Sequence, residues 1–145
     1  MPPLSTLTPS TIADIAVVGA GLAGLATALA CVPRASVTLL DAGTLEGCGD
    51  TRASFLSTSS QRLLNRLGVW VESQPVVSMD VGEGEAGRPL RGTPLVFGGN
   101  GELGAVVENA ALHTTLVSAV RASDVEVRGG VHVDDHAVEG GTAVL

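Results

Sequence analysis

A short glycine cluster near the start of the chain carries the clearest chemical signal in the sequence. Residues 19–24 read GAGLAG, the GxGxxG spacing of loops that hold a dinucleotide pyrophosphate. In such a loop Gly19 permits a tight turn, Gly21 lets phosphates approach the backbone, and Gly24 lets a helix pack closely on a strand. The start of that helix presents N–H groups and a positive dipole end to the phosphates. The cluster therefore predicts a phosphate-binding loop.

An acidic residue stands where such a loop needs a partner for the ribose. Asp41 follows Gly21 by twenty residues, after a short apolar run. A carboxylate at the end of the second strand can accept both ribose hydroxyls, and it disfavours a phosphate on the ribose. The bound adenosine is therefore expected to belong to FAD or NAD rather than NADP. The motif alone does not choose between FAD and NAD.

The flanking residues predict the elements that position these groups. Ile12–Val18 is predicted as a buried strand, Leu22–Val32 as a helix, and Ser36–Leu40 as a second buried strand. Pro33 ends the helix. We expect the two strands to be adjacent and parallel, with a right-handed crossover through the helix. The fold class expected is α/β, with a Rossmann-like FAD-binding βαβ unit and an inserted antiparallel β segment in an incomplete domain.

A membrane span or signal sequence is an alternative for part of this stretch, because Ile15–Val32 contains no charged residue. No Lys or Arg precedes it, so the positive region of a signal peptide is missing. The stretch also changes from β-branched residues to glycines and then to Ala and Leu, whereas a span keeps one character. The strand-and-helix interpretation is favoured.

Composition limits the classes of partner. The 145 residues include eight basic and fifteen acidic side chains, a net charge of -7, which disfavours nucleic acid and anionic lipid. Cys31 and Cys48 have no CxxC spacing, so we expect reduced thiols, no disulfide and a cytoplasmic location.

The rest of the chain divides by texture. Residues 1–11 are predicted as a flexible leader, 12–75 as the FAD-binding βαβ unit with its following helix, 76–108 as an inserted antiparallel sheet, and 109–145 as a truncated return to the FAD-binding domain. Gly43–Leu56 is predicted as a loop. A helix is predicted over residues 57–70, capped by Ser59 or Ser60 and ended at Gly68. A further helix is predicted over Asn109–Arg121.

Several other residues invite a functional interpretation that we disfavour. His132, Asp134 and His136 alternate and would share one face of a strand, but no further ligand follows at metal-site spacing, so a polar turn is expected and no metal. Trp70 is interpreted as a core residue rather than a flavin-stacking group. His113 has no acid or nucleophile at a telling spacing.

A family resemblance joins these segments. The order GAGLAGLATAL, LLDAG, TRASFLSTSSQRLLNRLGVW, SMDVGEGEAGRPL and ELGAVVENAALHTTLVSAV resembles the ubiquinone-biosynthesis family of FAD-dependent aromatic hydroxylases, relatives of para-hydroxybenzoate hydroxylase. The resemblance selects FAD. It implies that Arg52 lies near the flavin, and that Glu108 and Asn109 open the later helix with Asn109 near the FAD. A surface arginine and a helix-capping asparagine are the alternatives for these two residues.

The resemblance also implies a function. It suggests an NAD(P)H- and O2-dependent monooxygenase that hydroxylates a polyprenylated phenol-type ring, with membrane-peripheral or quinone-synthesis-complex association. No catalytic side chain is assigned, because the cofactor supplies the reactivity. The Gly-Asp-Ala segment of the family is absent, so the chain resembles an N-terminal part, expected to be inactive alone. The alternative is a stand-alone dinucleotide-binding module or an inactive fragment without redox chemistry.

Overall fold

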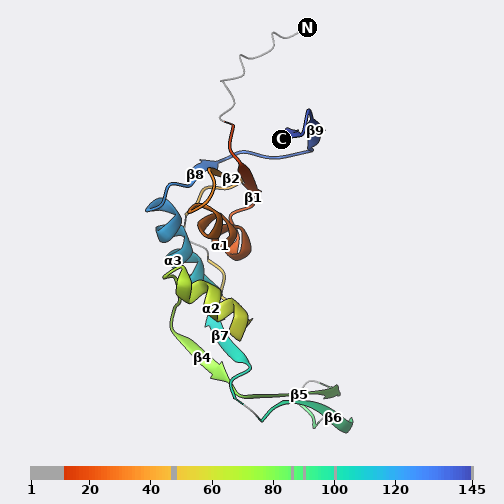
Figure 1. Ribbon diagram of the computed structural model, residues 1–145. Helices are drawn as coiled ribbons and strands as arrows, with labels where there is room; N and C mark the ends of the chain where they lie inside the picture. Colours follow the sequence, from red (N-terminus) through yellow and green to blue (C-terminus); the bar gives the residue numbers. More distant parts are fainter. Residues whose placement is uncertain (1–11, 47–48, 86, 90, 100, 145) are drawn as a thin grey trace. The chain divides into compact units, whose positions relative to one another are not determined.

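The computed structural model describes residues 12–46, 49–85, 87–89, 91–99 and 101–144 of the chain (Figure 1). They form two compact units, one within Met1–Leu45 and Val120–Leu145 and the other within Glu46–Ala119. The predicted leader, residues 1–11, and Cys48 lie outside the described residues. The domain boundaries drawn from the sequence stay a prediction.

The first unit contains a parallel sheet of three strands in the order β1-β2-β8. Its strands are β1 (Ile15–Val18), β2 (Val37–Asp41) and β8 (Glu126–Gly129). Ile15 pairs with Val37 and Val18 with Leu40, so β1 and β2 are adjacent and parallel, as predicted. Strand β1 begins later than predicted, because Asp14 turns its carboxylate onto the backbone N–H and hydroxyl of Ser36 instead of continuing the ladder.

Burial distinguishes the strands of this sheet. The first four residues of β2 are all buried, since β2 pairs on both sides. Residues of β1 alternate between half-buried and exposed, so the prediction of a buried strand was wrong for β1, which is paired on one side only. Helix α1 (Leu22–Cys31) packs against β1 and β2, and its Leu25 is fully buried. Burial of one such side chain contributes about 1.5 to 3 kcal/mol.

The stretch for which a membrane span was the alternative is not one continuous helix. Ile15–Val32 is a strand, a turn and a ten-residue helix rather than one continuous helix, as predicted. Across the described residues, no helix is long and apolar enough to cross a membrane. Cys31 is a free thiol.

Two short strands, β9 (Ala137–Glu139) and β10 (Thr142–Val144), form an antiparallel hairpin near the end of the chain.

The second unit is built on an antiparallel sheet in the order β3-β7-β4. Its strands are β3 (Ala53–Ser57), β4 (Ser73–Val76) and β7 (Gly104–Glu108). The prediction of a loop up to Leu56 was wrong for β3, which is held by pairing with β7 from Ala53–Glu108 to Ser57–Gly104. The partner strand lies some fifty residues later in the chain, so local sequence carries no sign of it.

Two helices complete this unit. Helix α2 (Thr58–Arg66) begins at the cap Ser57, whose hydroxyl accepts the N–H of Ser60 at 3.4 Å, so the predicted caps Ser59 and Ser60 were wrong. Ser57 takes the role because β3 ends there and its backbone is still extended. Gly68 adopts φ +71°, the left-handed conformation predicted for it. Helix α3 (Asn109–Arg121) has the predicted bounds.

The remaining strands, β5 (Ser78–Glu83) and β6 (Arg91–Gly98), pair antiparallel, as predicted for this region. Every residue of β5 is exposed, so this hairpin adds nothing to the core. The core of the second unit instead joins the sheet to its helices through Leu64, Val69, Ala105, Val107, Leu112 and Leu116. Trp70 is only half-buried, and the neighbouring Val69 takes the buried place that we expected for Trp70.

Candidate functional site

The glycine loop lies at the carboxyl end of β1, where the chain turns into α1. The N–H of Gly19 donates to the Leu40 carbonyl at 2.8 Å, which continues the β1-β2 ladder to the edge of the sheet. Gly21 is the N-cap of α1, and no side chain caps the helix. The first intrahelical bond runs from the Leu25 N–H to the Gly21 carbonyl at 3.0 Å. The N–H groups of the first turn therefore lack a side-chain acceptor and suit an anion.

In the structure, the three glycines of the motif differ in why a glycine is needed at each position. A Cβ on Gly24 would collide with the carbonyl oxygen of Gly19, so helix and strand need a glycine there. Gly19 has φ +98°, a conformation that L side chains rarely adopt. Gly21 has an ordinary φ of -72°, and a Cβ on it would meet no atom of the chain within 4 Å. The fold itself thus explains Gly24 and Gly19 but does not explain Gly21.

The carboxylate of Asp41 lies against the same loop. Its Oδ2 accepts the N–H of Ala20 at 2.6 Å, and its Oδ1 accepts the N–H of Gly43 at 2.8 Å. Both bonds use backbone donors and hold the half-buried carboxylate at the end of β2. A carboxylate has about four lone-pair positions, so each oxygen keeps room for a further donor such as a hydroxyl. The side chain predicted for the ribose and the predicted phosphate loop are therefore in direct contact.

A second polar cluster lies in the other unit, where the start of β3 meets the end of β7. The Asp50 carboxylate accepts the Nε and Nη2 hydrogens of Arg52, both at 2.8 Å. It also accepts the side-chain amide of Asn109 at 2.9 Å. The pairing of Ala53 with Glu108 brings these segments together, and the Asn109 N–H donates to the Arg52 carbonyl at 3.0 Å. Of the predicted residues, the structure thus joins Arg52 to Asn109.

Asp50 is the residue of this cluster that the sequence interpretation missed. Its side chain is 15% exposed, whereas that of Arg52 is 81% exposed. The hydrogen bonds from Arg52 and Asn109 lower the pKa of Asp50 well below its usual range. An acid two residues before an arginine in a glycine-rich loop was the available signal.

Asn109 carries an unmet hydrogen-bonding requirement. Asn109 is buried, with 7% of its surface exposed, and its Oδ1 has no hydrogen-bond partner among the described residues. A carboxylate only accepts hydrogen bonds, so the Asn109 amide must turn its NH2 group toward Asp50 and its oxygen away. Among the described residues, this oxygen is therefore an acceptor without a donor. Leaving such an atom unpaired costs about 1 to 3 kcal/mol.

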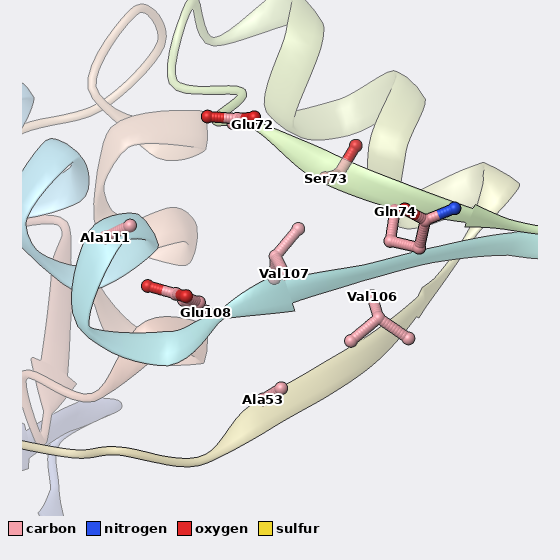
Figure 2. Close-up of a pocket in the computed structure, with 8 residues that line it drawn as sticks. All are labelled: Ala53, Glu72, Ser73, Gln74, Val106, Val107, Glu108 and Ala111. Carbon is pink, nitrogen blue, oxygen red and sulfur yellow. The ribbon is translucent and has the colours of Figure 1, made fainter.

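A cavity of about 460 Å³ opens beside the antiparallel sheet of this unit (Figure 2). Its polar lining includes the carboxyl-bearing residues Glu72, just before β4, and Glu108, at the end of β7. The register that pairs Ser73 with Val107 brings these two acids to neighbouring positions. Two carboxylates and no basic side chain in the lining disfavour a phosphate in this cavity.

The histidines do not assemble a metal site in the part of the chain that is described. His132 Nε2 lies 3.5 Å from Asp134 Oδ1, and both side chains are more than three-quarters exposed. The described residues hold no group of three or more side chains suited to a metal ion. His136 donates its backbone N–H to the carboxylate of Asp135, and residues 131–136 are in neither a strand nor a turn, so the prediction of a turn was wrong.

Comparison with known proteins finds likeness only at the level of structure. No family model and no curated protein sequence matches the chain. The structure of FqzB aligns with 88% of this chain at 21% identity and a TM-score of 0.66, over 31% of its own length. The tetrameric 2-methyl-3-hydroxypyridine-5-carboxylic acid oxygenase aligns with 79% at 22% identity and a TM-score of 0.58, over 30% of its length.

A third structure contains a cofactor. The flavin-dependent monooxygenase PieE, in complex with FAD and substrate, aligns with 81% of this chain at 23% identity and a TM-score of 0.55. The chain covers 24% of PieE, and so spans at most about a third of these structures. At such identities the likeness establishes a shared fold. The chain has the α/β fold of one part of these structures.

Proposed function

We propose that the chain binds the ADP half of FAD at its glycine loop and is the FAD-binding part of a flavin-dependent aromatic hydroxylase. The observation that carries the proposal is the open space at Gly21. Gly19 and Gly24 are required by the backbone of this fold, but at Gly21 the fold would accept a side chain. A glycine that the chain does not need for itself is explained by a ligand that comes close to the backbone.

The chemistry around Gly21 supports a pyrophosphate as that ligand. The start of α1 has no acidic residue in its first turn and no side-chain cap, so its N–H groups and positive dipole end suit an anion. Asp41 stands at the end of the neighbouring strand, where we propose that it accepts ribose hydroxyls. Phosphates at the start of the helix and a ribose at Asp41 are the two groups that an adenosine diphosphate places in a Rossmann-like βαβ unit. We therefore propose an adenosine diphosphate as the ligand.

FAD rather than NAD is supported by the shared fold. PieE, one of the structures that this chain resembles, is a flavin-dependent monooxygenase with FAD bound. We further propose that Arg52 and Asn109 contact the cofactor. The exposed guanidinium of Arg52 suits an anionic oxygen, and the unpaired Oδ1 of Asn109 requires a hydroxyl or N–H donor.

Beyond cofactor binding, we propose a reaction and a class of substrate. Bound and reduced by NAD(P)H, FAD supplies the oxygen-activating chemistry of such enzymes, while the protein supplies binding and orientation. On the resemblance of its sequence, we propose a polyprenylated phenol-type ring of ubiquinone biosynthesis as the substrate class. A membrane-peripheral or quinone-synthesis-complex association follows from so apolar a substrate. We assign no catalytic side chain to this chain.

The test is to titrate the full chain with FAD, ADP and NAD. FAD binding is measured by fluorescence quenching, and binding of ADP and NAD is measured by calorimetry. We expect FAD and ADP to bind and to compete. Gly21→Val is expected to abolish both, because a branched side chain would occupy the pyrophosphate position. Binding of NAD in preference to FAD would favour a dinucleotide-binding module without flavin chemistry. FAD affinity that survives Gly21→Val would contradict the proposed site.

A further inference from the structure

The Asp41 carboxylate touches the glycine loop itself. Val18, the last residue of β1, pairs with Leu40, and β2 continues for one more residue. Asp41, the next residue of β2, reaches across the sheet edge to accept the N–H of Ala20 at 2.6 Å. Ala20 is 8% exposed and stands between the first two glycines of the motif. The bond therefore fixes the peptide between Gly19 and Ala20, one residue before Gly21.

Such a hydrogen bond can order a glycine loop before the ligand binds. Glycine loses more backbone freedom on ordering than any other residue, so a loop with two glycines resists adopting one conformation. A ligand that must order the loop on binding loses affinity by the cost of that ordering. A charge-assisted hydrogen bond from a rigid central strand can order the loop beforehand. Strand β2 is such a support, because it is paired on both sides and buried.

We propose that Asp41 is a positioning residue for the pyrophosphate loop in addition to being the ribose acceptor, so that one carboxylate couples recognition of the two groups. This rests on the proposed function, because it assumes that an adenosine diphosphate binds at this loop. Asp41 retains lone pairs for ribose hydroxyls while it holds the N–H groups of Ala20 and Gly43. Its loss therefore weakens phosphate binding even where no ribose hydroxyl is present.

A pair of ligands separates the two roles. ADP and an ADP analogue without ribose hydroxyls are titrated calorimetrically into the full chain and into the Asp41→Ala variant. If Asp41 only accepted ribose hydroxyls, the variant and the unaltered chain would bind the analogue equally well. We expect the variant to bind the analogue about three- to tenfold more weakly, because the loop is no longer ordered in advance. Equal affinity for the analogue would overturn the positioning role.

Asp14 provides a matched control. Its carboxylate also accepts a backbone N–H across β1 and β2, from Ser36 at 2.9 Å, but at the opposite end of the two strands. The Ser36 hydroxyl donates to the same carboxylate oxygen at 2.7 Å, so Asp14, like Asp41, is a carboxylate that accepts hydrogen bonds between neighbouring segments. Asp14→Ala should leave both ligand affinities unchanged. An equal loss of affinity in Asp14→Ala would assign the effect to general loosening of the sheet and would contradict the proposal.

Measurements without ligand complete the test. We expect the backbone amides of the glycine loop to exchange with solvent faster in Asp41→Ala than in Asp14→Ala, while amides within β2 exchange alike. Asp41→Asn is expected to be intermediate in loop exchange and in affinity for the analogue, because its amide keeps one acceptor oxygen. Unchanged loop exchange in Asp41→Ala would refute the inference. Failure of the unaltered chain to bind ADP would instead refute the proposed function, whatever the exchange shows.

Discussion

Replacing Gly21 and Gly24 separately by alanine should separate effects on ligand binding from effects on folding stability. A Cβ on Gly24 would meet the carbonyl oxygen and, at 3.1 Å, the carbonyl carbon of Gly19. Main-chain atoms cannot rotate away, so the strain falls at the upper end of overpacking costs, about 3 kcal/mol. Alanine inside a helix stabilises the folded state by about 1 kcal/mol relative to glycine. We therefore expect Gly24→Ala to lose about 2 kcal/mol of stability.

The same change at Gly21 has nearly balanced effects on stability. Its φ of -72° suits alanine, and a Cβ there meets no atom within 4 Å. Reduced freedom of the unfolded chain stabilises by about 0.4 to 1 kcal/mol. Alanine at an N-cap costs a similar amount, about 0.5 to 1 kcal/mol. The stability of Gly21→Ala should stay within about 0.5 kcal/mol of the unaltered chain, while ADP affinity falls about tenfold or more because the methyl group occupies the phosphate approach.

The assay must report on the first unit. Trp70 belongs to the other unit, so its fluorescence is not a suitable probe. Amide exchange at Leu39, which is fully buried in β2, measures the local unfolding free energy, and ADP titration measures binding. The reasoning would be refuted if Gly21→Ala lost as much stability as Gly24→Ala and still bound ADP normally.

Three further predictions concern the second unit, whose urea unfolding Trp70 fluorescence should report. Asp50→Asn should destabilise it, and because the folded-state pKa of Asp50 lies below the ordinary 3.8, this stability difference should be constant above that pH and shrink as the pH falls below it; a difference that grows in acid would contradict the cluster. Ser57→Ala should cost about 0.5 to 1 kcal/mol, and no loss would show that the long cap bond contributes nothing. Leu64→Ala should cost about 2 to 5 kcal/mol, and a loss below 1 kcal/mol would mean that its burial is overestimated.

Sequence reasoning succeeded where the signal was local. The strand, glycine turn and helix around Gly21 follow from β-branched residues, a spaced glycine motif and a terminating proline, which all act within one turn or strand. Helix α3 was likewise bounded correctly, from Asn109 to Arg121, by its apolar spacing. The reasons predicted for Gly19 and Gly24 agree with the positive φ of Gly19 and with the collision that a Cβ on Gly24 would make, whereas the reason predicted for Gly21 depends on a ligand and stays a prediction.

The failures came from contacts between distant residues. Strand β3 reads as a loop because its residues, ASFLS, alternate only weakly, and its pairing with β7 supplies the order. The cap of α2 was misplaced because consecutive hydroxyl residues all qualify, and the end of β3 selects Ser57. Asp50 was missed although Arg52 stands only two residues away, because its other partner, Asn109, lies 59 residues away.

The central claim is tested most directly by mapping bound ADP onto backbone amides of the full chain by heteronuclear NMR. We predict that the largest shift changes on ADP addition fall on the amides of residues 19–24 and of Asp41. FAD should reproduce those changes and add others, including at Asn109. Binding of ADP that leaves the loop amides unmoved, or no binding at all, would contradict the account.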